Sequence, residues 1–231
     1  SDPLLFTESS TAHDSPAISP SSLEDIVGCR FSFLNNALFK FRETAQPEAA
    51  ISSRDYGTLW HAVLAEFYRN QLYAAWNAGK LVARLEPNNR KTYLDQLQKI
   101  AEEILKKAPG KMFVGHPTLF KLEEEKISGA LLHWLDDELQ RQQANGFYPA
   151  RVEFKFGPTA SVPAVAVPFT DGKVLLLEGR MDRLDFQVAD PEAKCPEVSA
   201  VRVIDYKSGK ADNSKKNVKI EALEALLSAQ C

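Results

Sequence analysis

The chain has 231 residues, of which 44% are hydrophobic and 26% charged. That length is enough for one sizeable hydrophobic core, and no run approaches the ~20 apolar residues that a membrane span needs. The net charge of −3 does not indicate nucleic-acid binding, which usually leaves a basic footprint, and the three cysteines favour a reducing, cytoplasmic location over a disulfide framework.

The N-terminal residues 1–20 are rich in Ser, Thr and Pro and contain no apolar segment typical of a signal peptide. They predict a linker or a disordered N-terminus, and we expect the folded domain to occupy residues 21–231. Ser21 is followed three residues later by Glu24, a capping-box pattern that predicts the start of a helix. Apolar residues then recur at helical spacing: Phe31, Leu34, Leu38 and Phe41.

A second helix is predicted over residues 55–79, with Leu59, Val63 and Phe67 forming an apolar stripe. His61 lies a quarter to a half turn away from that stripe. A lone histidine on a largely apolar helix is more often a hydrogen-bonded core residue than a ligand. Neutral imidazole is nevertheless a good ligand for first-row metals, so both interpretations of His61 stay open here.

Two further amphipathic helices are predicted over residues 88–108 and 117–144. The second ends at Asn145-Gly146, which is a C-terminal capping signal. We interpret both helices as scaffold, and residues 80–146 as a helical insertion in the domain.

Alternating apolar and polar residues predict a strand over residues 149–156. Glu153 lies on the polar face of this strand, where it either is solvated or serves a site. A Pro-interrupted edge strand is predicted over residues 162–169. The dipeptide Asp171-Gly172 then predicts a hairpin turn into the next strand.

The two strands predicted over residues 173–186 and 201–207 carry the most informative acids. Asp205 and Lys207 are two residues apart and therefore project from the same face. If the two strands pair as a hairpin, Asp182 lies beside Asp205. Converging carboxylates repel each other unless a cation lies between them, and oxygen ligands of this kind suit Mg²⁺ or Mn²⁺. The alternative is that all three are ordinary polar residues on a solvated strand face.

The last segment, residues 217–230, predicts an amphipathic helix in which the chain ends, so we expect a domain truncated at its C-terminus. The segment before it is rich in lysine. It either forms a locally basic surface for DNA or is a solvated loop. These lysines are Lys207, Lys210, Lys215, Lys216 and Lys219.

The two predicted site strands contain Gly179-Arg180-Met181-Asp182-Arg183-Leu184-Asp185 and Val203-Ile204-Asp205-Tyr206-Lys207-Ser208-Gly209. Their order and spacing resemble the PD-(D/E)XK nuclease superfamily, and in particular its RecB/AddB-type branch. The resemblance implies an α/β fold with a restriction-endonuclease-like core, in which helices flank a central mixed sheet of four to five strands. It also implies a metal-dependent DNA nuclease, an exonuclease domain that processes DNA ends in recombinational repair.

The same resemblance assigns roles to individual residues. It implies that Asp182 and Asp205 bind one or two Mg²⁺ or Mn²⁺ ions, with the carbonyl of Tyr206 completing the coordination. The helix at 55–79 supplies a histidine ligand in the family, and His61 is the residue that matches. Lys207 would orient or deprotonate the attacking water, or contact the phosphate. Residues that match less specifically are candidates for secondary or substrate contacts: Glu153, Gln230 and Lys210.

Cys29 lies where AddB-type members have one ligand of an iron–sulfur cluster. The match is incomplete, because Arg30 replaces the usual proline. A 4Fe–4S cluster needs four thiolates, and this sequence has only Cys29, Cys195 and Cys231. We therefore favour a buried structural thiol at Cys29, and a cluster only if the full-length protein supplies further cysteines.

The expected partner is DNA, and no membrane is expected. The phosphate-binding pattern G-x-x-x-x-G-K-[ST] does not occur, so a helicase or ATPase would be a separate polypeptide or an N-terminal region that precedes this chain. Two alternatives stay open: a non-catalytic DNA-binding or scaffold module that keeps the fold, and a metal-dependent hydrolase of small phosphoesters. The non-catalytic alternative predicts losses among the four main site residues, and all four are present: His61, Asp182, Asp205 and Lys207.

Overall fold

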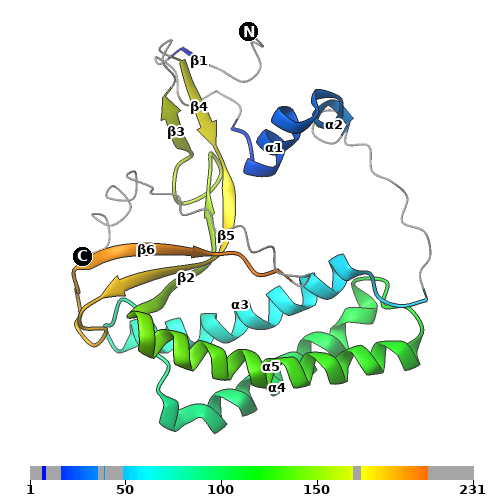
Figure 1. Cartoon of the computed structure of the whole chain (residues 1–231), viewed down its shortest axis with the longest axis vertical. Helices are drawn as coiled ribbons and strands as arrows, with labels where there is room; N and C mark the ends of the chain where they lie inside the picture. Colours follow the sequence, from blue (N-terminus) through cyan, green and yellow to red (C-terminus); the bar gives the residue numbers. More distant parts are fainter. Residues whose placement is uncertain (1–6, 9–16, 36–38, 40–48, 169–172, 208–231) are drawn as a thin grey trace. The chain divides into compact units, whose positions relative to one another are not determined.

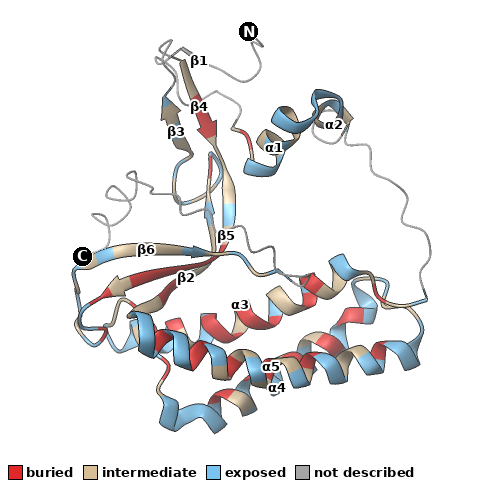
Figure 2. Ribbon diagram, in the orientation of Figure 1, coloured by how far each residue is buried: buried red, intermediate tan, exposed pale blue. Residues whose placement is uncertain are grey.

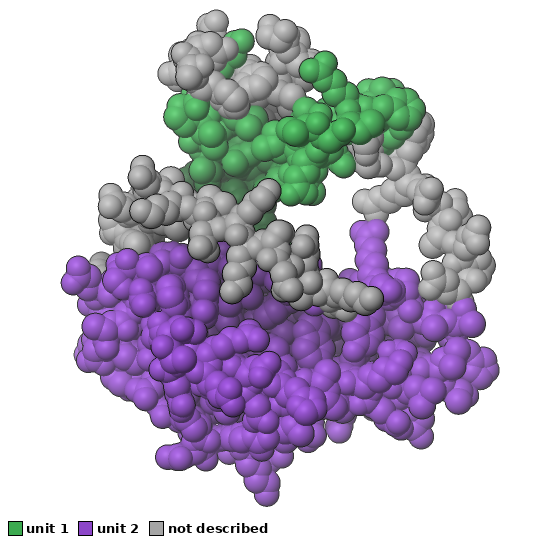
Figure 3. All heavy atoms as spheres, viewed as in Figure 1, with its two compact units in different colours: residues 1–47, 154–181 green, residues 48–153, 182–231 purple. Residues whose placement is uncertain are grey.

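The computed structural model describes residues 7–8, 17–35, 39, 49–168 and 173–207. The fold is α/β, as the sequence predicts. The chain divides into two compact units (Figure 3). Unit 1 comprises residues 1–47 and 154–181, and unit 2 comprises residues 48–153 and 182–231.

Three long helices make up most of the described part of unit 2 (Figure 1). They are α3 (Ser53–Asn77), α4 (Arg90–Lys107) and α5 (Pro117–Asn145), with 3-10 turns η2 (Pro87–Asn89) and η3 (Ala108–Gly110) on either side of α4. The side chain of Ser52 caps α3 by accepting the N–H of Asp55 at 3.1 Å. Gly146 ends α5 in the left-handed conformation, at φ 64°. All three helices lie within a few residues of their predicted bounds.

The hydrophobic core of unit 2 lies among these helices (Figure 2). The predicted stripe of α3 is buried at Leu59, Val63 and Phe67. The ring of Phe67 meets Tyr93 of α4 and Trp134 of α5 edge-on, with centroids 6.1 and 6.0 Å apart. These aromatic contacts join all three helices.

A three-stranded sheet of order β2-β5-β6 packs with the helices of unit 2. Its strands are β2 (Phe147–Phe156), β5 (Gly179–Val188) and β6 (Val198–Ile204), of which residues 154–156 and 179–181 belong to unit 1. The hairpin predicted for the two site strands is confirmed: β5 and β6 pair antiparallel, with Arg183 opposite Ile204. Asp182 comes just before Arg183 on β5, and Asp205 comes directly after the end of β6.

Unit 1 contains a second three-stranded sheet, of order β1-β4-β3. Its strands are β1 (Thr7–Glu8), β3 (Val165–Pro168) and β4 (Lys173–Leu177), and β3 pairs antiparallel with β4 as expected of the predicted hairpin. The strand predicted over residues 173–186 is therefore divided at Glu178, and two sheets replace the single one expected. Glu178 leaves the ladder because its N–H donates to the carbonyl of Ile18 at 3.0 Å.

The N-terminal helix differs in detail from its prediction. Helix α1 (Pro20–Gly28) is capped by Ser19, which accepts the N–H of Ser22, and not by Ser21. Pro20 then occupies the first turn, where the N–H that proline lacks would have no helical partner. The helix breaks at Cys29, α2 (Arg30–Phe33) follows, and Phe31 is 70% exposed.

The favoured buried thiol at Cys29 is wrong, because this cysteine is exposed. Cys29 is an extended residue between α1 and α2, with φ −158° and ψ 109°, so it lies on neither helix's packed face. Several predictions fall outside the described residues: those on Leu38, Phe41, Asp171-Gly172, Lys210, Gln230 and the helix at 217–230. Among the described helices, none is long and apolar enough to cross a membrane.

The burial of α5 residues predicts that two substitutions on this helix lower the free energy of unfolding by different amounts. Leu131 is fully buried, so Leu131→Ala should lower the free energy of unfolding by about 2–5 kcal/mol. Leu122 is 49% exposed, and Leu122→Ala should change the free energy of unfolding by less than about 0.5 kcal/mol. Urea unfolding followed by tryptophan fluorescence measures both, since Trp60, Trp76 and Trp134 all lie in unit 2. Equal costs would contradict the burial described for α5.

Candidate functional site

Three segments of unit 2 bring polar groups together at one point: α3 supplies His61, β5 supplies Asp182, and the residue after Asp205 supplies its backbone. The Nε2 atom of His61 lies 2.6 Å from the carbonyl oxygen of Tyr206. The Nδ1 atom of His61 lies 3.3 Å from Oδ2 of Asp182. That same oxygen accepts the N–H of Tyr206 at 2.9 Å. The imidazole, the carboxylate and one peptide unit thus contact one another.

The contacts of His61 indicate that this arrangement needs a proton or another cation. A carbonyl oxygen can only accept, so Nε2 donates its proton to Tyr206. Nδ1 then faces a carboxylate, and this contact is favourable only if a proton or another cation lies between the two. Asp182 is only 9% exposed, which strengthens that requirement.

A nitrogen, a carboxylate oxygen and a carbonyl oxygen form a donor set that suits Mn²⁺ or Mg²⁺. Within the described residues, no group of three or more His, Cys, Asp or Glu side chains is placed to hold a metal ion. An ion at this point would therefore use the carbonyl of Tyr206, or a carboxylate brought in by side-chain rotation, beside His61 and Asp182.

Asp205 and Lys207 pair with each other next to this point. Nζ of Lys207 lies 2.6 Å from Oδ2 of Asp205, and both side chains are exposed. Tyr206 between them directs its ring into the core, as expected for alternating side chains. The structure thus brings together His61, Asp182 and Tyr206, and it places the Asp205 carboxylate on Lys207.

Glu153 has an unusual backbone conformation. Its φ of 49° is the only positive value at a non-glycine residue in the described part of the chain, and it falls within β2. Such a conformation costs about 1–3 kcal/mol and often marks a bulge or a functional position. The half-buried Glu153 side chain is not among the groups that meet His61 or Asp182 in the contacts above.

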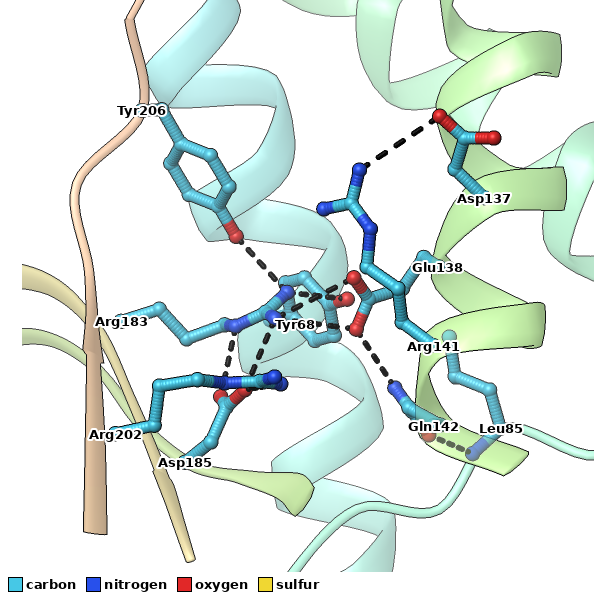
Figure 4. Close-up of polar contacts among 10 residues, drawn as sticks. All are labelled: Tyr68, Leu85, Asp137, Glu138, Arg141, Gln142, Arg183, Asp185, Arg202 and Tyr206. Atoms are coloured by element: carbon cyan, nitrogen blue, oxygen red, sulfur yellow. Dashed lines mark hydrogen bonds and ion pairs between the residues drawn. The ribbon is translucent and has the colours of Figure 1, made fainter. Parts of the chain in front are cut away.

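Sequence reasoning missed a buried ionic cluster that borders the site (Figure 4). Arg183 is 1% exposed and pairs with Asp185 on its own strand and with Glu138 on α5. It also donates to the hydroxyl of Tyr68 on α3 at 2.6 Å. One signal for this cluster was present in the sequence, because Glu138 falls on the inward stripe of α5, three residues after Leu135.

Burial and the neighbouring groups together set the protonation states of the tyrosines and the arginine in this cluster. Burial raises the pKa of Tyr68 well above its usual value, and the nearby charge of Arg183 only partly opposes it. Burial also raises the pKa of the Tyr206 hydroxyl. For Arg183, burial acts to lower the pKa, but the surrounding hydroxyls and acids hold that pKa above its usual value. The hydroxyls therefore stay protonated and the guanidinium stays charged.

The raised pKa of Tyr68 predicts a loss of stability at alkaline pH. Above pH ~10, Tyr68 of the unfolded chain loses its proton while the folded chain keeps it, so the free energy of unfolding falls by up to about 1.4 kcal/mol per pH unit. Tyr68→Phe should make that fall shallower above pH ~10. Urea unfolding at a series of pH values measures it, with the exposed Tyr73→Phe as the matched control. Equal slopes in Tyr68→Phe and the parent would contradict the assignment.

Comparison with known proteins identifies the family of the chain. Three similar curated proteins are each named as a subunit of an ATP-dependent helicase/deoxyribonuclease. They come from Heliobacterium modesticaldum (31% identity over 84% of the chain), Desulforudis audaxviator (29% over 83%) and Lacticaseibacillus casei (29% over 71%). The aligned part of the chain covers 14%, 15% and 13% of their lengths. Residues 17–230 match the family model of the PD-(D/E)XK nuclease superfamily, and the chain belongs to that superfamily.

Proposed function

We propose that this chain hydrolyses DNA phosphodiesters with Mg²⁺ or Mn²⁺, as an exonuclease domain that processes DNA ends in recombinational repair. The observation that carries the proposal is the meeting of His61, Asp182 and the Tyr206 peptide unit beside Asp205 and Lys207. Membership of a nuclease superfamily supports the reaction class. The relatives' names support DNA as the substrate.

The proposed ligands are the imidazole of His61, the carboxylate of Asp182 and the carbonyl of Tyr206. Asp205 becomes a further ligand if its exposed side chain rotates away from Lys207. When bound, the ion offsets negative charge on the scissile phosphate and makes water a better nucleophile. The chain's own residues hold the ion at the end of β6.

Lys207 acts on the substrate side of this arrangement. Its ammonium group is exposed and lies beside Asp205, so it is placed to contact the phosphate or to orient the attacking water. Glu153, Lys210 and Gln230 remain candidates for secondary contacts.

The names of the relatives support a helicase as a partner. Their names combine a helicase with a deoxyribonuclease, and the chain spans about one-seventh of their length. We infer that residues 21–231 act as a nuclease domain, with a helical insertion at 80–146, beside a helicase on the same or another polypeptide.

The metal site predicts a specific loss in Asp182→Asn. The parent chain should degrade end-labelled linear duplex DNA when Mn²⁺ is added and should bind Mn²⁺ in a calorimetric titration. Asp182→Asn should lose more than the roughly 10–100-fold that loss of an outer-shell group costs, in cutting and in Mn²⁺ affinity. Asp137→Asn removes an exposed carboxylate on α5 and is the matched control.

The outcomes of this test differ in meaning. Binding of Mn²⁺ without cutting, lost in Asp182→Asn, would leave the site in place and show that cutting needs a further part of the protein. If the parent neither binds nor cuts, the nuclease proposal fails, and a non-catalytic DNA-binding or scaffold role replaces it.

The proposed role of Lys207 predicts that its loss slows DNA cleavage without weakening Mn²⁺ binding. Lys207→Met should slow cleavage by about 10²–10⁴-fold, the range for loss of a group that moves or orients a proton. Mn²⁺ affinity should not fall, since an ammonium group cannot be a ligand and its removal leaves Asp205 able to turn toward the ion. Lys99→Met, at an exposed position of α4, is the control. Loss of Mn²⁺ binding in Lys207→Met would contradict this division of roles.

A further inference from the structure

A guanidinium group buried next to the candidate site joins two of the segments that build it. Nη1 of Arg183 donates to the hydroxyl of Tyr68 at 2.6 Å and to the hydroxyl of Tyr206 at 3.1 Å. Tyr68 belongs to α3, the helix that carries His61. Tyr206 supplies the carbonyl that His61 contacts and the N–H that Asp182 accepts.

The ion pairs and hydrogen bonds of Arg183 with two acids hold the guanidinium in one orientation. Asp185 faces its Nε and Nη2 atoms at 2.8 and 3.0 Å, and Glu138 lies 3.1 Å from Nη2. Each acid has a second partner: Arg202 approaches Asp185 at 2.7 Å, and Gln142 donates to Glu138 at 3.0 Å. Figure 4 shows the guanidinium enclosed by these groups. A planar group bonded along several edges has little freedom to turn.

Tyr206 lies beyond the end of β6, so the β5–β6 ladder does not fix its position and its side-chain contacts must do so. Strand β6 ends at Ile204, and the last residue pair of the β5–β6 ladder is Arg183 with Ile204. The ring of Tyr206 instead packs against the core, lies edge-on to the imidazole of His61 with centroids 5.8 Å apart, and bonds Arg183 through its hydroxyl. Its side chain therefore fixes where its peptide unit lies.

The register of α3 depends on the same nitrogen. His61 and Tyr68 are seven residues apart, about two helical turns, so they project from the same side of α3. Tyr68 is fully buried and lies under the Arg183 guanidinium, whose central carbon is 4.7 Å from the ring centroid. A shift of α3 along the sheet would break this contact and would move His61 away from Asp182.

We propose that Arg183 is a positioning residue for the metal site: through the hydroxyls of Tyr68 and Tyr206 it sets the distance between the imidazole of His61 and the Tyr206 carbonyl. The inference rests on the proposed function, since it concerns how tightly the site holds its ion. Arg183 itself contacts neither His61 nor Asp182 among the interactions described above.

The test uses Mn²⁺ alone as the probe, titrated calorimetrically into the full chain. Tyr206→Phe removes the hydroxyl and keeps the backbone carbonyl, so it should weaken Mn²⁺ binding by about 10-fold, as loss of an outer-shell group does. Tyr93→Phe is the matched control, because it removes another tyrosine hydroxyl of the same core, one that accepts the N–H of Glu86 at 3.2 Å. It should leave Mn²⁺ affinity unchanged.

A double-mutant cycle identifies the partner of that hydroxyl. Arg183→Lys keeps a positive charge for the buried acids but loses the forked geometry, and it should weaken Mn²⁺ binding at least as much, since it disturbs the contacts with both tyrosine hydroxyls. Adding Tyr206→Phe to Arg183→Lys should weaken binding little further, since the contact it removes is already broken. Arg90→Lys, which alters an exposed arginine paired with Asp136 outside this cluster, should bind Mn²⁺ as the parent does.

Two results would overturn the inference while leaving the proposed function intact: parental Mn²⁺ affinity in Tyr206→Phe while Asp182→Asn binds none, or equal weakening in Tyr206→Phe and Tyr93→Phe. A parent chain that binds no Mn²⁺ would instead remove the proposed metal site, and the inference with it. Melting temperatures measured without metal identify the variants that are folded, and the affinities are compared among those.

Discussion

The structure of unit 2 depends on the burial of one charged side chain, Arg183, between the sheet and the helices. Placing a guanidinium out of water costs several kcal/mol unless acids and hydrogen bonds compensate it, and leaving one partner of such a cluster alone costs about 3–5 kcal/mol. Asp185, Glu138 and two tyrosine hydroxyls supply the compensation. Since these groups come from β5, α3, α5 and the segment after β6, the cluster forms only when all four are in place.

A hydrophobic contact in the same position would allow more ways of packing. Apolar side chains are attracted without a preferred direction, whereas hydrogen bonds to a planar guanidinium form only along fixed directions. In many proteins a buried ionic cluster adds little net stability. We infer that the cluster around Arg183 contributes mainly to the geometry of the candidate site, whose contacts are 2.6–3.3 Å long.

The sequence predicted the parts of the molecule that depend on periodicity and short motifs. Helices α3, α4 and α5 follow from apolar residues at helical spacing, and the β5–β6 hairpin follows from two motif-bearing runs joined by a loop rich in proline. The division of one predicted strand at Glu178 was not predictable, because its cause is a hydrogen bond to Ile18, 160 positions earlier in the chain. The exposure of Cys29 likewise depends on a helix break that composition does not reveal.

The residues of the candidate site were easier to predict than the reason they meet. Asp182, Asp205 and Lys207 stand in a recognisable motif, whereas the cluster around Arg183 combines residues that each have an ordinary role elsewhere. A tyrosine on a buried helix face and an arginine on a strand do not predict contact when 115 residues separate Tyr68 from Arg183. Only Glu138, an acid on an apolar stripe, pointed to a buried partner of opposite charge.

The end of β6 explains why the site forms at this point of the sheet. β6 is the edge strand of its sheet, so only alternate residues of β6 exchange backbone hydrogen bonds with β5. Tyr206 lies just beyond the last ladder pair, so its N–H can reach Asp182 and its carbonyl can reach His61. The side chain of Tyr206 takes the place of ladder hydrogen bonds, because the bond from Arg183 to its hydroxyl fixes the position of the segment after β6.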